Sequence, residues 1–153
     1  MTKFKALVPD PQPPVYLLVD PNRRDVQAWN QWREENSEVH VDLTGVNLTG
    51  AKLRGANLTR VDLAGAFLTN VNLTDAVLTN VNLVGAVLSR ADMTQADLYG
   101  ANLTGAVLTG ADLTRADLTD ADLTRAVLTG VDLTSVDTTG TILNVQNEGA
   151  TNG

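Results

Sequence analysis

The chain has 153 residues, which corresponds to one domain of ordinary size. It has no cysteine and one histidine, so disulfides and thiolate sites are excluded and little remains for zinc or acid–base chemistry. The 11 Lys and Arg residues against 18 Asp and Glu residues give a net charge of −7, which argues against nucleic acid or an anionic membrane as the direct partner. Proteins or cations remain as the expected partners.

The sequence contains no segment that predicts membrane insertion or export. The longest apolar run, Val15 to Val19, has five residues, whereas a membrane-spanning helix needs about 20. Residues 1–14 also lack the apolar stretch of a signal peptide. We therefore expect a soluble, cytoplasmic protein with no membrane contact and no direct binding of nucleic acid.

Residues 1–40 predict an extended arm followed by a helix. The stretch from Pro9 to Pro14 is typical of an extended, polyproline-like chain, and Val15 to Val19 predicts a short strand. A helix over residues 21–35 is expected next, with Asp20 or Asn22 as its N-cap. These elements are expected to flank the repeats that begin at residue 41.

The predicted helix brings two tryptophans, Trp29 and Trp32, to one face. The favoured interpretation is a structural cap, in which both rings cover the first leucines of the repeats, Leu43 and Leu48. A repeat rod needs such a cap because each of its ends exposes the apolar interior. A surface that stacks against a ligand or a partner is the alternative interpretation.

From residue 41 the sequence repeats with a period of five residues. Leucine recurs at every fifth position from Leu43 to Leu133, with Met93 as the one exception, and the residue two positions earlier is Ala or Val from Val41 to Val136. Five residues advance a helix by about 500°, so no helix face would collect the leucines, and an odd period alternates the faces of a flat strand. The chain must therefore turn once per repeat and coil around its own leucines.

The residue before each leucine indicates how many repeats make one coil. This outward position is usually Asp or Asn, and its apolar exceptions include a set spaced by 20 residues: Phe67, Val87, Val107 and Val127. Four pentapeptides per coil align this set in one column, which predicts a four-sided rod of about five coils over residues 41–145. Residues 146–153 then form a polar tail. Either a strand over residues 141–145 closes the last coil, or this end meets a second copy.

The repeats resemble a known family. The run ANLTGAVLTGADLTRADLTDADLTRAVLTG, residues 101–130, is similar to the pentapeptide-repeat pattern A(D/N)LXX, and the resemblance covers about two thirds of the chain. It implies an all-β fold, a right-handed quadrilateral parallel β-helix with the Leu and Ala/Val layers inside, and the handedness comes from the resemblance alone. The family is abundant in cyanobacteria, and most of its members have no assigned function.

The second half of the rod is acidic. Residues 91–140 contain eight Asp and two Arg, and a 20-residue spacing places six of the Asp in two ladders on neighbouring sides: Asp92, Asp112 and Asp132, and Asp97, Asp117 and Asp137. A few members of the resembled family inhibit or protect DNA gyrase by imitating duplex DNA, which makes DNA mimicry one hypothesis. The local hypothesis is that Asp and Asn both bond nearby backbone at this position. Calcium binding is a further alternative, although stacked carboxylates lack the loop of a calcium cage.

The sequence contains no catalytic motif. His40 has Asp42 nearby, but no motif supplies a nucleophile, and no Walker or dinucleotide-binding glycine pattern occurs. His40 is therefore interpreted as a surface or junction residue. We expect a protein that is not an enzyme and that has no cofactor and no metal site.

The column of Phe67, Val87, Val107 and Val127 is the candidate contact surface, because exposed apolar patches commonly mark contacts. Alternatively, Val is simply a good strand former there. The partner would be either the chain's own segment Phe4 to Val19 or another molecule. The predicted function is a non-catalytic scaffold for another protein of unknown identity, and a gyrase-directed DNA mimic is the alternative. A homodimer would form through the C-terminal end or through the apolar column.

Overall fold

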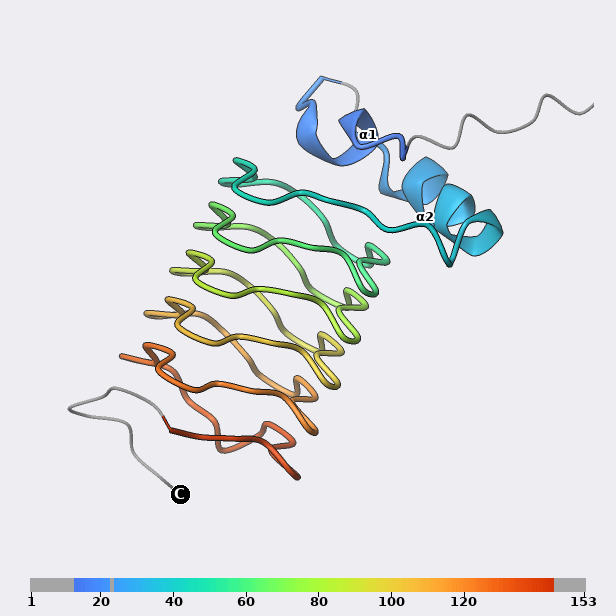
Figure 1. Cartoon of the computed structure of the whole chain (residues 1–153). Coiled ribbons are helices and arrows are strands. Elements are labelled where there is room, and N and C mark those ends of the chain that lie inside the picture. Colours follow the sequence, from blue (N-terminus) through green and yellow to red (C-terminus); the bar gives the residue numbers. More distant parts are fainter. Residues whose placement is uncertain (1–12, 23, 145–153) are drawn as a thin grey trace, which may run out of the picture.

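The computed structural model of the chain describes residues 13–22 and 24–144 (Figure 1). Two helices, α1 (Tyr16–Val19) and α2 (Val26–Glu35), lie at one end of a stack of coils that runs from residue 41 to residue 144. Neither helix is long and apolar enough to cross a membrane, and no other helix occurs in these two ranges. The coils are joined by isolated parallel bridges, and no continuous strand forms within the described chain.

Every bridge joins an outward residue to the residue 20 positions later, as the sequence predicts. In the first pair of coils the Leu43 N–H donates to Asp62 O at 2.8 Å, and the Asp62 N–H donates to Val41 O at 2.9 Å. One coil therefore consists of four pentapeptides, and residues 41–140 make five coils. Because the same bonds recur from coil to coil, the backbone groups of the rod are paired along most of its length.

Each corner of a coil is a β-turn, and its third residue has a positive φ at every corner from residue 45 to residue 140 except Ser135. At the first corner the Val46 N–H donates to Leu43 O at 3.1 Å, and Gly45 has a φ of 66°. Non-glycine residues adopt the same conformation at other corners, for example Arg60 with a φ of 57°. The repeating turn therefore imposes this conformation even on side chains that adopt it at a cost.

The core is a continuous column of buried Leu and Ala or Val residues. Leu88 and Met93, in the middle of the rod, are fully buried. Some residues expected in these inward layers are only partly buried: Val46, Val131, Leu133 and Val136. The last three belong to the coil of residues 121–140, beneath which the structure describes only residues 141–144.

The final coil opens along residues 131–135. The predicted bridge from Asp112 to Asp132 is not formed in the part of the chain that the structure describes. The Arg115 N–H instead bonds Ser135 Oγ at 3.2 Å, and the corner at Ser135 lacks the positive φ of the other corners from residue 45 to residue 140. Pairing resumes afterwards, with the Leu123 N–H donating to Ile142 O at 2.9 Å. Residues 141–144 thus continue the rod beneath residues 121–125, and Val145, the last residue of the predicted strand, lies outside the described residues.

The predicted strand from Val15 to Val19 is wrong, because this segment forms the single helical turn α1. The Leu17 N–H donates to Pro14 O at 2.9 Å, and Leu18 is buried in the core. No neighbouring strand is present in the described chain to pair with this segment, so its backbone bonds are made locally. Of the predicted proline-rich stretch, residues 9–12 lie outside the described residues.

The predicted start of the main helix is also wrong, because α2 begins at Val26 and not at residue 21. Its N-cap is Asp25, whose carboxylate accepts the Ala28 N–H at 2.9 Å. The expected capping residues form a separate turn, in which the Asn22 N–H donates to Asp20 Oδ1 at 2.9 Å. Neither residue caps the helix, because both precede its N-cap position, Asp25.

Candidate interaction surfaces

The apolar column occupies one side of the rod. Bridges connect its members in an unbroken series: Asn47 to Phe67, Phe67 to Val87, Val87 to Val107 and Val107 to Val127. Phe67 is 51% exposed, and the three valines are partly exposed. We call Phe67, Val87, Val107 and Val127 the apolar stripe.

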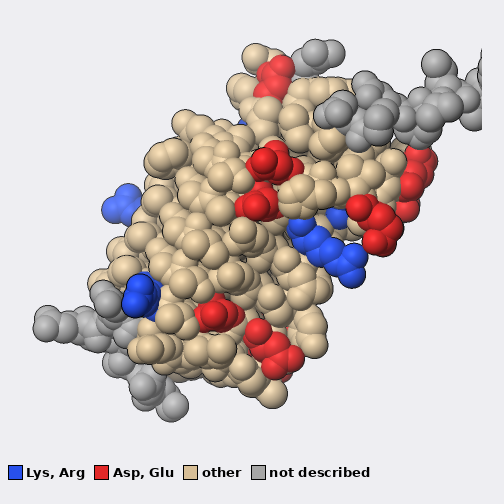
Figure 2. All heavy atoms as spheres, in the orientation of Figure 1, with Lys and Arg blue, Asp and Glu red and all other residues tan. Residues whose placement is uncertain are grey.

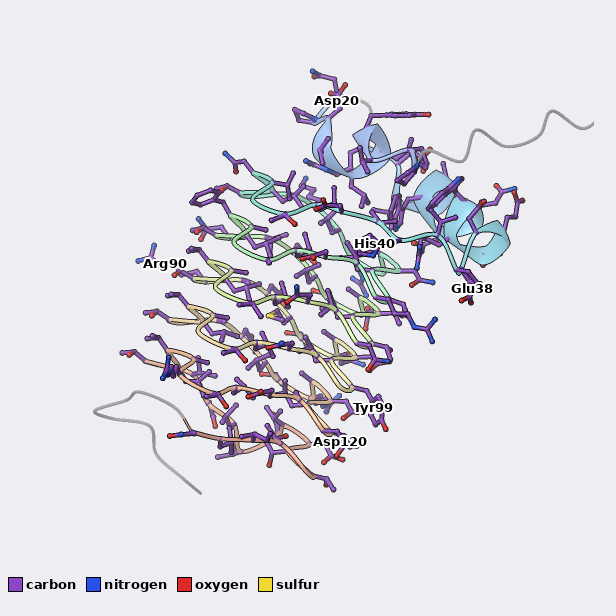
Figure 3. The ribbon with its side chains drawn as sticks, in the orientation of Figure 1. Asp20, Glu38, His40, Arg90, Tyr99 and Asp120 are labelled. Carbon is purple, nitrogen blue, oxygen red and sulfur yellow. The ribbon has the colours of Figure 1, made fainter. Side chains whose placement is uncertain are left out.

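The side of the rod that carries the stripe contains no acidic residue. This holds for residues 44–50 and for the equivalent segments 64–70, 84–90, 104–110 and 124–130. Its charged residues are Arg90 and Arg125, and Arg90 projects from the edge of the rod opposite Tyr99 and Asp120 (Figure 3). In a chain with a net charge of −7, this side is therefore distinct in both hydropathy and charge.

The described part of the N-terminal arm does not lie along the stripe. Leu18 of α1 belongs to the same buried cluster as Trp29 of α2 and Leu43 of the first coil, so this part of the arm covers the N-terminal end of the rod. The rest of the segment from Phe4, up to residue 12, lies outside the described residues. The structure thus assigns Leu18 to the core.

One of the two predicted acidic ladders is bridged throughout, and the other only in part. Asp97 is bridged to Asp117, and Asp117 to Asp137, so this ladder has three members. In the other ladder Asp92 is bridged to Asp112, but the expected continuation to Asp132 is wrong because the final coil opens at this point. The second ladder therefore has two stacked members.

Each outward Asp or Asn side chain makes the same kind of local hydrogen bond. In each case the side-chain Oδ1 accepts the backbone N–H of the residue two positions later. Asp117 accepts from Thr119 at 2.8 Å, and Asn102 accepts from Thr104 at 3.0 Å. The bond is made by every Asp and Asn that stands at this position between residues 42 and 137: Asp42, Asn47, Asn57, Asp62, Asn72, Asn82, Asp92, Asp97, Asn102, Asp112, Asp117, Asp122, Asp132 and Asp137. A carboxylate and an amide are interchangeable in this bond.

Hydrogen bonds hold the pKa of several of these carboxyls below the ordinary value. The threonine hydroxyl two residues later is the largest cause, followed by its backbone N–H, for Asp42, Asp122 and Asp137. For Asp132 the backbone bond is the larger cause of the lowered pKa. At Asp92 burial is the largest single effect and acts to raise the pKa, but bonds from two threonines and the charge of Arg54 outweigh it.

Other polar groups also engage the acids. Thr79 Oγ1 donates to Asp97 Oδ2 at 2.9 Å, and Arg54 pairs with Asp75 at 2.8 Å. Figure 2 shows one face of the rod, on which the acidic side chains form small groups separated by uncharged and basic residues. The acidic residues visible on that face therefore do not form a continuous negative surface.

The two tryptophans occupy different environments. Trp29 is fully buried, and its indole N–H donates to Asn57 O at 2.8 Å, so its ring is enclosed between α2 and the first coil. Trp32 is partly buried, with its ring centroid 5.5 Å from that of Trp29. Arg33 is also buried and donates to Val39 O at 3.1 Å and to Thr59 O at 2.8 Å. These contacts fix α2 across the N-terminal end of the rod.

His40 and Asp42 do not form a catalytic pair. Both are exposed, and Figure 3 places His40 at the junction between α2 and the first coil. Asp42 accepts both the N–H and the hydroxyl of Thr44, at 2.9 and 2.6 Å, and makes no hydrogen bond with His40. Within residues 13–22 and 24–144, no group of three His, Asp or Glu residues is placed to hold a metal ion.

One concave surface was not predicted. A shallow polar groove lies between α2 and the first coil, lined by Gln27, Gln31 and Glu34 of the helix and by Arg54 and Gly55 of the coil. Arg54 is already paired with Asp75. The packing of α2 onto the rod creates this groove, and no sequence motif joins its two walls.

The repeat region matches the family model of pentapeptide repeats over residues 39–75, 72–110 and 106–144. No curated protein matches the sequence. Among solved structures, the pentapeptide repeat protein Rfr23 from the cyanobacterium Cyanothece 51142 is 32% identical with a TM-score of 0.67, over 76% of this chain and 95% of that one.

Two further structures are similar. A pentapeptide repeat protein of the Arabidopsis thaliana thylakoid lumen is 32% identical with a TM-score of 0.63, over 65% of this chain and 70% of its own. HetL, a pentapeptide repeat protein involved in heterocyst differentiation regulation in Nostoc sp. strain PCC 7120, is 33% identical with a TM-score of 0.52, over 69% of this chain and 59% of its own.

Proposed function

This chain belongs to the pentapeptide repeat family, and from that premise we propose that its right-handed, four-sided rod is a non-catalytic scaffold that binds another protein through the apolar stripe. The handedness is that expected of the family. The observation that carries the proposal is the stripe itself, four apolar side chains in one bridged column on a side without acidic residues. Contiguous exposed apolar groups of this kind are typical of protein contacts.

The alternative function is mimicry of DNA by the acidic ladders, directed at DNA gyrase. It has less support, because the outward carboxylates make the same backbone bond as the neighbouring asparagines. Their occurrence is therefore explained without a partner. The ladder from Asp92 also stops at Asp112, which shortens the negative surface that a DNA-binding protein would meet.

The scaffold proposal is tested by Val107→Asp, with Val77→Asp as the matched control. Both change an outward valine to aspartate, and Val77 stands on the side of Asp97 and Asp117, away from the stripe. Each new carboxylate can accept the N–H two residues later, so both variants should fold as the parent does. In affinity capture from the source cell, Val107→Asp should lose a protein that the parent and the control retain. Identical recovery by all three would refute the stripe as the contact.

A supercoiling assay with purified gyrase tests the alternative. The scaffold proposal expects no effect of the chain on supercoiling. Inhibition by the parent that is lost in the double variant Asp112→Asn and Asp117→Asn would favour mimicry, because this variant keeps the local backbone bonds and removes two charges. The two assays use different variants, so their outcomes are independent.

A further inference from the structure

Two arginines flank the apolar stripe. Arg90 stands at the corner that follows Val87, and Arg125 stands at the corner that precedes Val127, so the two lie on opposite edges of the stripe and two coils apart. Both side chains are exposed, and neither forms an ion pair with another residue of the described chain. Each edge of the stripe therefore carries a positive charge that these residues do not neutralise.

The corner residues on the edge that precedes the stripe are mostly glycines. At Gly65, Gly85 and Gly105 an added Cβ would meet nothing within 4 Å. Arg60 adopts the same left-handed conformation at another corner, so the turn itself accepts a side chain. Val84, beside Gly85, adds an apolar side chain that is 37% exposed. A partner can thus approach this edge closely and meet backbone and apolar groups there.

The geometry of the stripe fits a helix better than a strand. Its members are one coil apart, about 4.8 Å, so the four span about 14 Å along the rod. The apolar residues of a helix recur about every 5.4 Å along its axis, whereas same-face residues of a strand recur about every 6.7 Å. A strand also finds no free backbone to pair with, because the Phe67 N–H donates to Val46 O and the Leu68 N–H donates to Val87 O, both at 2.8 Å.

Given the scaffold function proposed for the stripe, we infer that its partner is an amphipathic helix with acidic residues on both flanks of its apolar face, lying along the axis of the rod. Arg90 and Arg125 are two coils apart, about 9.6 Å along that axis. Six residues of a helix rise about 9 Å and turn about 600°, which places two acidic residues on opposite flanks of one face. Two acidic residues six positions apart therefore face both arginines while the apolar residues between them contact the stripe.

Charge makes other occupants of the stripe less suitable. Two copies of this side would bring four arginines together without an acidic residue, and like charges repel. The chain's own residues 1–12, MTKFKALVPDPQ, contain two lysines and one aspartate, so they lack the required negative charge. An anionic membrane would attract the two arginines but repel a chain whose net charge is −7.

The test measures the binding of a designed helix to the full chain by fluorescence anisotropy. The probe is a labelled peptide of about 18 residues, long enough to hold a helix, with leucines along one face and two glutamates six positions apart on its flanks. A control peptide has lysine in place of both glutamates. The chain should bind the glutamate peptide about tenfold more tightly than the lysine peptide, and salt should reduce this difference because it screens the ion pairs.

Variants of the chain locate the binding surface. Arg125→Glu should weaken binding of the glutamate peptide several-fold, and the double variant with Arg90→Glu should prefer the lysine peptide. The matched control is Arg115→Glu, because Arg115 stands in the same pentapeptide sequence, ADLTR, with the same φ within 1°, half a coil away from the stripe corner. It should bind as the parent does. Val107→Asp should weaken binding of both peptides, and Val77→Asp should not.

Equal binding of the two peptides by the parent, or equal effects of Arg125→Glu and Arg115→Glu, would overturn the inference. Self-association of the parent that Val107→Asp abolishes would assign the stripe to a second copy instead. Binding to phosphatidylserine vesicles that is lost in the same variant would assign it to a membrane. If Val107→Asp loses a captured protein but the parent does not bind the glutamate peptide, the scaffold proposal stands and the acidic helix is refuted.

Discussion

The residue before each inward leucine points outward, and its side chain turns back to accept the N–H two residues later. Asp122 makes this bond to Thr124 at 2.8 Å, and Asn72 makes it to Thr74 at 3.0 Å. Where Phe67 or Val87 replaces the polar residue, the bridges to the neighbouring coils are kept. The bond therefore stabilises the turn locally, while the pairing between coils is independent of the side chain.

Substitutions of Asp122 separate the effect of its hydrogen bond on stability from the effect of its negative charge. At neutral pH Asp122→Asn should be about as stable as the parent, whereas Asp122→Ala should lose about 1 kcal/mol because the Thr124 N–H loses its acceptor. The Thr124 bonds lower the pKa of Asp122 in the folded chain. Its charge therefore stabilises the fold above the unfolded pKa of about 3.9, and this contribution is lost as the pH falls through the lower folded pKa.

Urea unfolding followed by circular dichroism at pH 7 and near pH 3 measures both effects. The parent should lose more stability on acidification than Asp122→Asn, which has no carboxyl at this position. Equal losses in the two proteins would contradict the assigned role of the charge. Asp42, Asp92, Asp132 and Asp137 also have lowered pKa values, so some acid sensitivity should remain in the variant.

At the scale of single elements, the sequence predicts the repeats far better than the N-terminal segment. The same spacing of residues recurs in every pentapeptide, so a single atypical residue does not change the predicted structure of the repeats. The run from Val15 to Val19 occurs once, and a short apolar run fits a strand or a helix equally well. Its conformation depends on how Leu18 packs against the end of the rod, which the local sequence does not encode.

Helix α2 should contribute to stability mainly through Trp29. Trp29→Ala should cost about 3–5 kcal/mol, because it opens a cavity over the first coil and removes the bond to Asn57 O. Trp32→Ala should cost clearly less, because that ring is only partly buried. Chemical denaturation of the two variants provides the comparison. Equal losses of stability in the two variants would contradict the position of α2, in which Trp29 is buried against the rod and Trp32 is only partly buried.

At the scale of the whole molecule, every coil depends on its neighbours, so stability is a sum of coils and of contacts between them. The open final coil shows the limit of prediction from sequence. Residues 131–135, VDLTS, match the repeat, and nothing in them predicts separation from the coil above. Asp137, beneath which no described residue packs either, keeps its bridge to Asp117, so the missing coil beneath does not by itself account for the separation. The position of the stripe, by contrast, follows from the spacing of 20 residues alone.

The middle of the rod is expected to be the part most sensitive to core changes. Leu88→Ala should cost about 2–5 kcal/mol, since Leu88 is fully buried between coils on both sides. Leu88→Asp should prevent folding, because it leaves an unpaired charge in the core. Met93→Leu is nearly isosteric and should cost less than about 1.5 kcal/mol. Thermal unfolding followed by circular dichroism ranks the three, and a tolerated Leu88→Asp would contradict the buried column.

The four-repeat coil restricts how such a chain can change length during evolution. Because residues 20 apart share a side, gain or loss of one pentapeptide would leave the leucine core intact and turn everything after it by a quarter of a circle. An insertion between Phe67 and Val87 would thus move Val87, Val107 and Val127 to the next side and divide the stripe. Duplications of 20 residues would lengthen every side without mixing them. A recognition surface on this fold is therefore inherited in units of whole coils, although the fold itself is inherited in units of five residues.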